Sequence, residues 1–162
     1  MNKIYMPPEP IPSSISNGIF LAGSIEMDKV ELWQTNIATK LATHYAPIFN
    51  PRRTHRDNTI VQSSDDAQFA EQVDWELDAL DQAEIILMYL DPNTKSPISL
   101  LELGLYATSK KMLVFCPMGF WRRGNVEMVC HKYDIPLYLN AITALHTRDL
   151  IRCIEKVWRQ IV

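Results

Sequence analysis

The fold of this chain is decided by the stretch Ile85-Ile86-Leu87-Met88-Tyr89-Leu90, followed by Asp91-Pro92-Asn93 and by Ser96-Pro97-Ile98-Ser99-Leu100-Leu101-Glu102-Leu103-Gly104-Leu105-Tyr106-Ala107. Six consecutive apolar residues are typical of a strand that is buried on both faces, and Asp-Pro-Asn ends it. A helix then begins, with Ser96 as its N-cap and Pro97 in the first helical position, where the missing N–H costs nothing. A buried strand that feeds a helix through a short turn is the unit of an α/β protein.

Similar units occur along the rest of the chain. Further short apolar runs predict strands at 19–22, 46–49, 112–115 and 135–138, and helical spacing of apolar residues predicts helices at 28–44, 65–81, 96–109, 126–132 and 145–162. Strands that are apolar on both faces and alternate with helices indicate a five-stranded, mostly parallel sheet covered on both sides. The Pro-rich residues 1–16 fall outside this pattern and are predicted as an extended arm, with 17–162 as a single domain.

The composition excludes several classes of protein. A net charge of −3 over 162 residues gives no electrostatic reason to bind nucleic acid. No apolar run approaches the ~20 residues of a membrane span, so no membrane partner is expected. The three cysteines form neither a metal-binding spacing nor an even set for disulfides, which predicts reduced thiols and a cytoplasmic protein.

Glu102 is the first candidate for chemistry. The leucines at 100, 101, 103 and 105 predict that its helix is largely buried, and a carboxylate buried among leucines has a raised pKa unless it is paired. On this feature alone, a structural Glu that caps a neighbouring backbone or pairs with an Arg is the slightly better explanation of Glu102. Its helix starts at the carboxyl end of strand 85–90, where parallel sheets bind ligands, and this position favours a functional role. Gly104 costs the helix about 1 kcal/mol relative to Ala, which indicates a close approach there.

A second carboxylate, Glu76, lies on the helix before strand 85–90, next to the predicted buried face of Val73, Leu77 and Leu80. Two carboxylates in one pocket can act as a nucleophile and a proton donor, as in retaining glycoside cleavage, where they stand ~5–5.5 Å apart. The nucleophile forms an ester at the anomeric carbon, and the second acid protonates the departing group.

Several short motifs together resemble the nucleoside 2-deoxyribosyltransferase family, and more narrowly its deoxyribosyltransferase-like branch. The resemblance extends from about Gly18 to Asn125 and rests on Phe20-Leu21-Ala22-Gly23-Ser24-Ile25, Asn50-Pro51-Arg52-Arg53, Trp75-Glu76, Ile86-Leu87-Met88, the 96–107 segment and Gly124-Asn125. It implies a flavodoxin-like three-layer fold and a double displacement between 2′-deoxynucleosides and free nucleobases that uses no metal or organic cofactor.

The resemblance also implies roles for individual residues. Glu102 falls on the Glu that attacks C1′, and Glu76 takes the place of the acid, usually Asp, that assists at the base. Asn125 resembles an Asn that reaches the 5′-hydroxyl of a sugar in the adjacent subunit, which implies a homo-oligomer. Together with the strand ends, these motifs make a set of candidate substrate-binding residues: Gly23, Ser24, Asn50, Arg52, Asp91, Ser96, Ser99, Tyr106 and Asn125.

Two positions depart from the family pattern. Ser96 stands where many members carry a sugar-binding Asp, which leaves Asp91 as the nearest acid. Phe20 stands where some members carry a Tyr that orients the nucleophile, so Tyr89 or Tyr106 would have to substitute for it.

Two alternatives remain. The first is hydrolysis of the N-glycosidic bond of a nucleoside or a nucleoside 5′-monophosphate. Glu26 and Asp28 after the first strand argue against a phosphate there, whereas Arg52 and Arg53 argue weakly for one. The second is a non-catalytic nucleotide-binding or sensor module of the same fold, which would release no free base.

Overall fold

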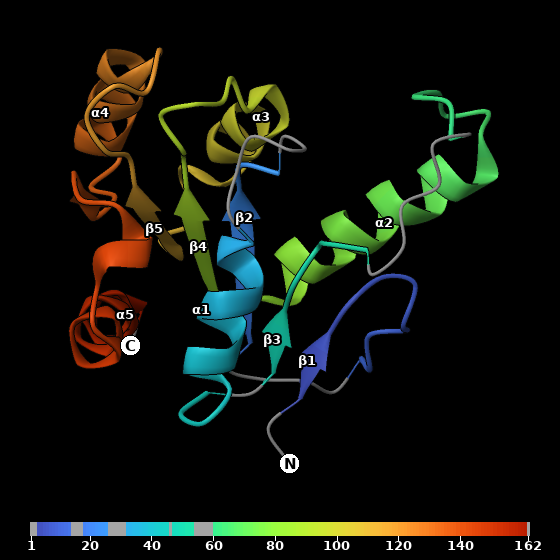
Figure 1. The fold of residues 1–162 in the computed structure, drawn as a ribbon, viewed down its shortest axis with the longest axis horizontal. Coiled ribbons are helices and arrows are strands. Elements are labelled where there is room, and N and C mark those ends of the chain that lie inside the picture. Colours follow the sequence, from blue (N-terminus) through green and yellow to red (C-terminus); the bar gives the residue numbers. More distant parts are fainter. Residues whose placement is uncertain (1–2, 14–17, 26–31, 46, 54–59, 162) are drawn as a thin grey trace.

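The chain forms one parallel sheet with helices on both faces (Figure 1). The computed structural model describes residues 3–13, 18–25, 32–45, 47–53 and 60–161. The strands are β1 (Ile4–Tyr5), β2 (Ile19–Gly23), β3 (Ile48–Phe49), β4 (Ile85–Tyr89), β5 (Met112–Phe115) and β6 (Leu137–Tyr138). The helices are α1 (Trp33–Leu41), α2 (Ala67–Gln82), α3 (Pro97–Tyr106), α4 (Arg123–Lys132) and α5 (Thr147–Ile161), with a short 3-10 turn at Ile142–Ala144.

The strand order is β1-β3-β2-β4-β5-β6, and every neighbouring pair is parallel. Apart from β1 this is the flavodoxin-like order, so the predicted fold class is confirmed. β2 and β4 form the centre and pair over five residues, from Ile19 opposite Ile85 to Gly23 opposite Tyr89. Both strands are buried throughout, as their apolar sequences predict.

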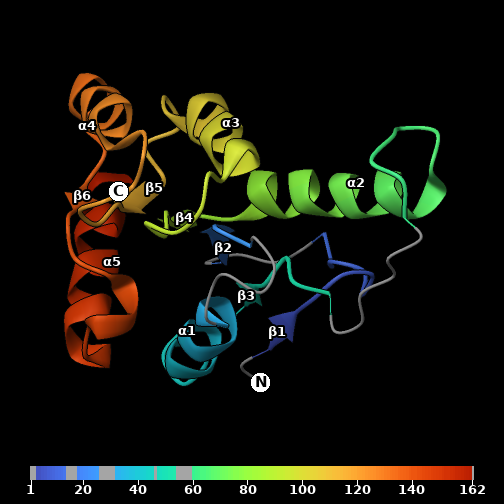
Figure 2. The same ribbon diagram turned by 45° about the horizontal axis from the view of Figure 1, so that its top comes forward.

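The core has two halves, one on each face of the sheet. Alternate residues of β2, β4 and β5 point to opposite faces, as the period of a strand requires. Ile19, Leu87 and Phe115 face α1 and α5, whereas Phe20 and Met88 face α2, α3 and α4. Figure 2 shows α1 and α5 on one side of the sheet and α2, α3 and α4 on the other.

The sheet has six strands where five were predicted. The extra strand comes from the Pro-rich lead, in which Ile4 and Tyr5 pair with β3 as an edge strand. The Asn50 N–H donates to the Tyr5 carbonyl at 2.9 Å, and the Trp75 indole N–H donates to the Glu9 carbonyl at 2.7 Å. Part of the predicted arm therefore lies on its own domain.

The predicted helices are all present, with shifted ends. α1 begins at Trp33, and most of the stretch between its predicted start at 28 and Trp33 lies outside the described residues. α4 begins at Arg123, three residues before its predicted start, and an Arg123–Glu127 ion pair of 2.8 Å spans its first turn.

The prediction that α3 is largely buried was wrong. Ile98, Leu101 and Leu105 are 60%, 58% and 57% exposed, whereas Leu103 is buried. A helix in one layer of a three-layer fold has only one face on the sheet, so leucines around its whole circumference cannot all be covered. Leu77 of α2, also predicted on a buried face, is 41% exposed.

Gly23 makes the central strand pair possible at its carboxyl end. Its φ is +130°, and a Cβ at this position would lie 2.1 Å from the Tyr89 carbonyl oxygen. A side chain would therefore force β2 and β4 apart at the point where the loops of the site begin.

We predict that Gly23→Ala destabilises the protein by at least about 2 kcal/mol, because it combines a backbone clash with a strained φ. Urea unfolding measures this change. Gly124→Ala is the matched control, since a Cβ there meets no atom within 4 Å. Equal stability of the two variants would contradict the assigned role of Gly23.

Candidate functional site

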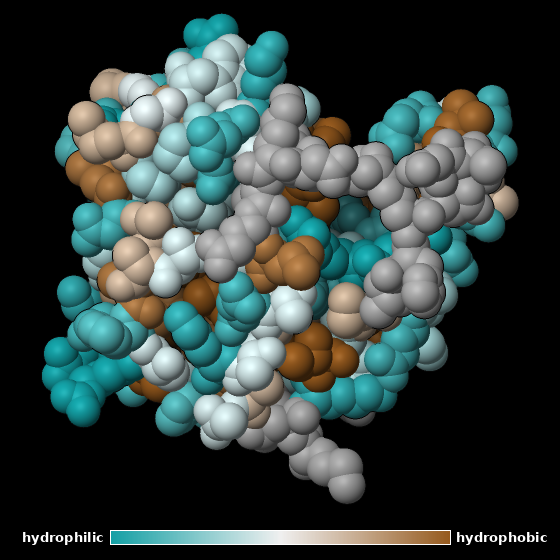
Figure 3. Space-filling view, in the orientation of Figure 1, coloured by the Kyte–Doolittle hydropathy of each residue, from teal (hydrophilic) through white to brown (hydrophobic). Residues whose placement is uncertain are grey.

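The candidate site lies beyond the carboxyl ends of β2, β3 and β4, between α2 and α3. The beginning of α2 projects past the sheet, and α3 stands above the strand ends (Figure 1). The outline of the molecule is indented between α3 and the beginning of α2 (Figure 3). In this topology the crevice at the β2–β4 switch point is where ligands bind.

Glu102 is buried on α3, with only 8% of its surface exposed. Burial first, and the charge of Glu76 second, raise the pKa of Glu102 from its ordinary 4.5 to about 8. Burial also raises the pKa of Glu76. The two predicted carboxylates come from different helices, yet the charge of one acts on the other. Ionising both at once is therefore unfavourable.

The environment of Glu76 differs from that of Glu102. The Gln72 side-chain amide donates to Glu76 Oε1 at 2.5 Å and to the Pro51 carbonyl at 2.9 Å. Arg53 donates its Nε–H to Gln72, and its charge favours the ionised form of Glu76 and so lowers the pKa. Of the two carboxylates, Glu76 therefore keeps its negative charge more easily, while Glu102 keeps the proton.

Ser24 and Ser96 belong to a buried cluster of hydroxyls at the switch point. Ser24 Oγ lies 2.8 Å from Thr94 Oγ1 and 2.6 Å from Ser96 Oγ, and it accepts the Asp91 N–H at 2.8 Å. Ser96 occupies the N-cap position of α3 but has a left-handed φ of +46°, and its side chain does not cap the helix as predicted. The cluster instead ties the loop after β2 to the loop after β4.

The remaining candidates near α3 have different surroundings. The Asp91 carboxylate accepts hydrogen bonds from the Asn93 N–H at 2.8 Å and from the Tyr89 hydroxyl at 3.2 Å. These bonds stabilise the turn that follows β4. The Tyr106 hydroxyl donates to Asp81 at 2.6 Å, away from the strand ends. Ser99 is buried on the face of α3 that also carries Glu102.

Asn50 and Arg52 lie beyond the end of β3. The buried Asn50 accepts the Arg52 N–H on Oδ1 at 3.1 Å and so shapes the turn. Arg52 donates its Nε–H to Gln34 of α1, also at 3.1 Å. Arg53 turns toward α2, where it binds Gln72, so the two arginines diverge.

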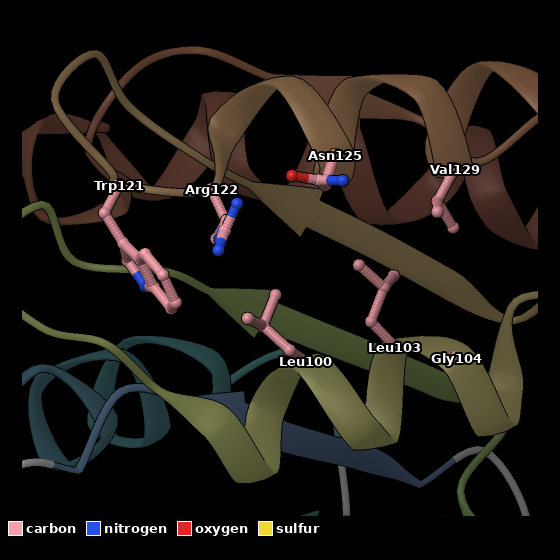
Figure 4. A pocket seen from close by; sticks show the side chains of 7 residues that line it. All are labelled: Leu100, Leu103, Gly104, Trp121, Arg122, Asn125 and Val129. Atoms are coloured by element: carbon pink, nitrogen blue, oxygen red, sulfur yellow. The ribbon is translucent and has the colours of Figure 1, made fainter.

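Within one chain, Asn125 lies apart from the candidate residues at the ends of β2, β3 and β4. It is exposed on α4 and lines a cavity of about 320 Å³ between α3 and α4, together with Leu100, Leu103, Gly104, Trp121, Arg122 and Val129 (Figure 4). Leu100 and Gly104 belong to the opposite flank of α3 from Glu102. This cavity is thus separate from the carboxylate pair.

Three further residues of this region were not predicted from the sequence: Gln72, Gln34 and Thr94. Gln72 stands four residues before Glu76 on one helix, a spacing that predicts contact and could have been used. Gln34 binds Arg52, which is 18 positions away, and Thr94 binds Ser24, which is 70 positions away. No local sequence pattern predicts contacts over such separations.

In the part of the chain that the structure describes, no group of three or more His, Cys, Asp or Glu side chains could hold a metal ion. Nor is any helix among those residues long and apolar enough to cross a membrane.

Comparison with known proteins gave one match. The family described as "Nucleoside 2-deoxyribosyltransferase like" matches residues 16–120, well over half of the chain. The match includes β2 to β5 and both carboxylates. A comparison with curated proteins found no match.

The raised pKa of Glu102 predicts how stability depends on pH. The folded state binds this proton more tightly than the unfolded chain does, so stability falls as the pH rises from about 4.5 to about 8. We predict that Glu102→Gln stabilises the protein by roughly 2–4 kcal/mol at pH 9 and by much less at pH 5. Urea unfolding at the two pH values measures the difference. Asp78→Asn, on an exposed part of α2, controls for loss of a charge, and a pH-independent effect of Glu102→Gln would refute the assignment.

Proposed function

The chain belongs to the nucleoside 2-deoxyribosyltransferase-like family, and we propose that it transfers a 2-deoxyribosyl group between nucleobases. The observation that supports this most is the carboxylate pair of Glu102 and Glu76 at the carboxyl edge of the sheet. A buried like-charge pair without an Arg on Glu102 is costly as scaffolding but suits glycosyl chemistry. The alternative of an Arg-paired structural Glu finds no support among the described residues.

In the first step, the ionised Glu102 attacks C1′ of the 2′-deoxynucleoside. A carbon–oxygen bond forms, the N-glycosidic bond breaks, and its electron pair leaves with the base nitrogen. Glu76 supplies the proton that the base takes up. The sugar is held as an ester of Glu102, and Glu76 is left as a carboxylate.

The pair needs one proton for this step, and the proton must be on Glu76. Between the two ionisations the pair holds a single proton, which rests mainly on Glu102. The reactive form is thus the minor arrangement, with Glu102 ionised. Gln72 remains beside Glu76 in either arrangement and orients its carboxyl group.

In the second step, the nitrogen of another base attacks C1′, and Glu76 accepts its proton. The ester bond breaks, and Glu102 regains its carboxylate. If water is the acceptor, the same site acts as a hydrolase. The 2′-deoxy sugar is favoured because no electron-withdrawing 2′-hydroxyl destabilises the developing positive charge.

We propose that the enzyme works in the cytoplasm without a metal or organic cofactor. Support for the location comes from the thiols of Cys116, Cys130 and Cys153, which are free and buried. An oxidising compartment would not favour this state.

Turnover tests the proposal directly. With thymidine and a different free base, chromatography should show the new deoxynucleoside and free thymine. We predict that Glu102→Ala abolishes both products and that Glu76→Gln slows them at least about 100-fold, since a proton transfer is lost. Asp78→Asn should leave the rate unchanged. Activity of Glu102→Ala within a few-fold of the unmodified enzyme would disprove the mechanism, and release of no base by the unmodified enzyme would favour a binding module.

We further propose that the active form is a homo-oligomer in which Asn125 completes the site of a neighbour. Ile98, Leu101 and Leu105 form an exposed apolar stripe along α3, at the spacing of one helix face. Gly104 lies beside this stripe, and a Cβ there would meet no atom of this chain within 4 Å. The close approach that a helical glycine indicates would then come from a second copy.

A mixing experiment tests the shared site. We predict that Glu102→Ala and Asn125→Ala, each impaired alone, regain activity when mixed, because a mixed dimer contains one site with both residues. Leu101→Glu should reduce both the size of the particle in sedimentation and the activity, whereas Leu139→Glu at the end of β6 should change neither. A fully active monomer would disprove the oligomer.

A further inference from the structure

The side-chain amide of Gln72 is held in one orientation by three hydrogen bonds. Its Nε2 donates one hydrogen to Glu76 Oε1 and the other to the Pro51 carbonyl, and its Oε1 accepts the Arg53 Nε–H. A flipped amide would turn its NH2 group toward the guanidinium and its oxygen toward the Pro51 carbonyl oxygen. Neither contact is a hydrogen bond, because a guanidinium has no acceptor and a carbonyl has no donor. The donor at Glu76 Oε1 is therefore a fixed feature of the site.

The two oxygens of the Glu76 carboxyl group have different surroundings. Oε1 accepts the Gln72 N–H, and a donor at that oxygen favours the form in which Oε1 is unprotonated. Oε2 accepts no hydrogen bond from the described residues, and it is not one of the buried side-chain atoms left without a partner. Glu76 itself is only half-buried. A neutral Glu76 consequently carries its proton on Oε2, the oxygen that a ligand can reach.

Arg53 brings a positive charge to this amide. Its side chain is 22% exposed and forms an ion pair of 3.6 Å with Glu71 of α2. Burial raises the pKa of Glu76, whereas the Gln72 hydrogen bond and the charge of Arg53 lower it. An amide that accepts from a guanidinium is a stronger donor than a free amide, since hydrogen bonds in a chain polarise one another. The charge of Arg53 thus acts on Glu76 both directly and through Gln72.

A negative charge reaches Glu76 from the opposite side. Glu102 of α3 is the acid whose pKa is raised by the charge of Glu76, after burial. Glu26 and Asp28, the acids expected after the first strand, lie outside the described part of the chain. Among the described residues, Glu76 is therefore placed between an acid on α3 and a guanidinium in the loop after β3.

We infer that Arg53 and Gln72 are positioning residues that keep the acidic proton of Glu76 on Oε2 and help it leave for the base. In the first step this proton moves from Oε2 to the base nitrogen, while the C1′–N bond breaks and Glu102 forms its ester bond. The Gln72 N–H stabilises the carboxylate that remains on Glu76. This hydrogen bond strengthens as the charge develops, which lowers the barrier to the proton transfer. In the second step Oε2 takes a proton back from the incoming base.

The inference rests on the proposed function and assigns two residues that act on it without touching substrate. A network that only fastened residues 50–53 to α2 would also contain these hydrogen bonds. Its loss would reduce stability and lower activity by the same factor at every pH. A positioning role makes the effect depend on pH, because Glu76 without the donor holds its proton more tightly. Loss of the first proton from the carboxylate pair then requires a higher pH.

The pH profile of kcat/KM for base release from thymidine tests this role in two variants. In Gln72→Met the acidic limb should move to higher pH by at least about 0.5 pH units, and the maximum should fall about tenfold. Arg53→Met should move the same limb in the same direction by less, because it leaves the Gln72 N–H on Glu76. Arg53→Lys, which restores a positive charge, should return the limb toward that of the unmodified enzyme.

Gln68→Met is the matched control. It makes the same substitution one turn earlier on α2, at an exposed side chain, and Arg53 binds its backbone carbonyl, which the variant keeps. Its profile should match that of the unmodified enzyme. Identical profiles of Gln68→Met and Gln72→Met, or a loss of activity in Gln72→Met that is the same at every pH, would overturn the inference.

A titration of the ligand-free protein makes the result independent of turnover. With ¹³C-labelled glutamate, the Glu76 carboxyl signal is identified by its absence in Glu76→Gln. Its midpoint should rise in Gln72→Met and stay unchanged in Gln68→Met. A raised midpoint in a protein that releases no base from deoxynucleosides would refute the proposed function alone. Release of base by the unmodified enzyme, together with an unmoved midpoint in Gln72→Met, would refute this inference alone.

Discussion

Parallel pairing of β2 with β4 over five residues determines both where the core lies and where the site can form. Each strand is buried on both faces, so the pair separates the two halves of the core. At its carboxyl end the strands approach so closely that only a glycine fits beside the Tyr89 carbonyl. The helices that follow, α1 and α3, lie on opposite faces of the sheet, and the hydroxyl cluster around Ser24 ties the end of β2 to the loop before α3.

Several features of the candidate site lower the stability of the folded protein. Glu102 is buried beside a second carboxylate, Gln34 keeps an amide donor without an acceptor, and Ser96 adopts a left-handed backbone conformation. Each feature is unfavourable by itself and persists only where the surrounding packed structure holds it in place. Their concentration at one edge of the sheet is typical of functional sites, where stability is given up for chemistry.

Local sequence was sufficient to find the carboxylates but not their partners. Glu102 and Glu76 stand out because each is an acid next to an apolar helix face, and the charge of Glu76 contributes to the raised pKa of Glu102. Ser24 and Ser96 are predicted substrate ligands, and the sequence did not reveal that their side chains bond each other. Contacts between hydroxyls that are about 70 residues apart in the sequence cannot be predicted from local spacing, because serine is common in loops whether or not it has such a partner.

The sequence by itself determined the α/β class, the strand and helix positions to within a few residues, and the helices that hold the two acids, because burial imposes periods of 2.0 and 3.6 on the chain. The tertiary structure alone decided that Ile4 and Tyr5 add an edge strand, that Leu101 and Leu105 face outward, and that Gln34 meets Arg52. Those outcomes depend on which surfaces meet after the layers have assembled, and the period of a single element records only that it has an apolar face, not what covers it.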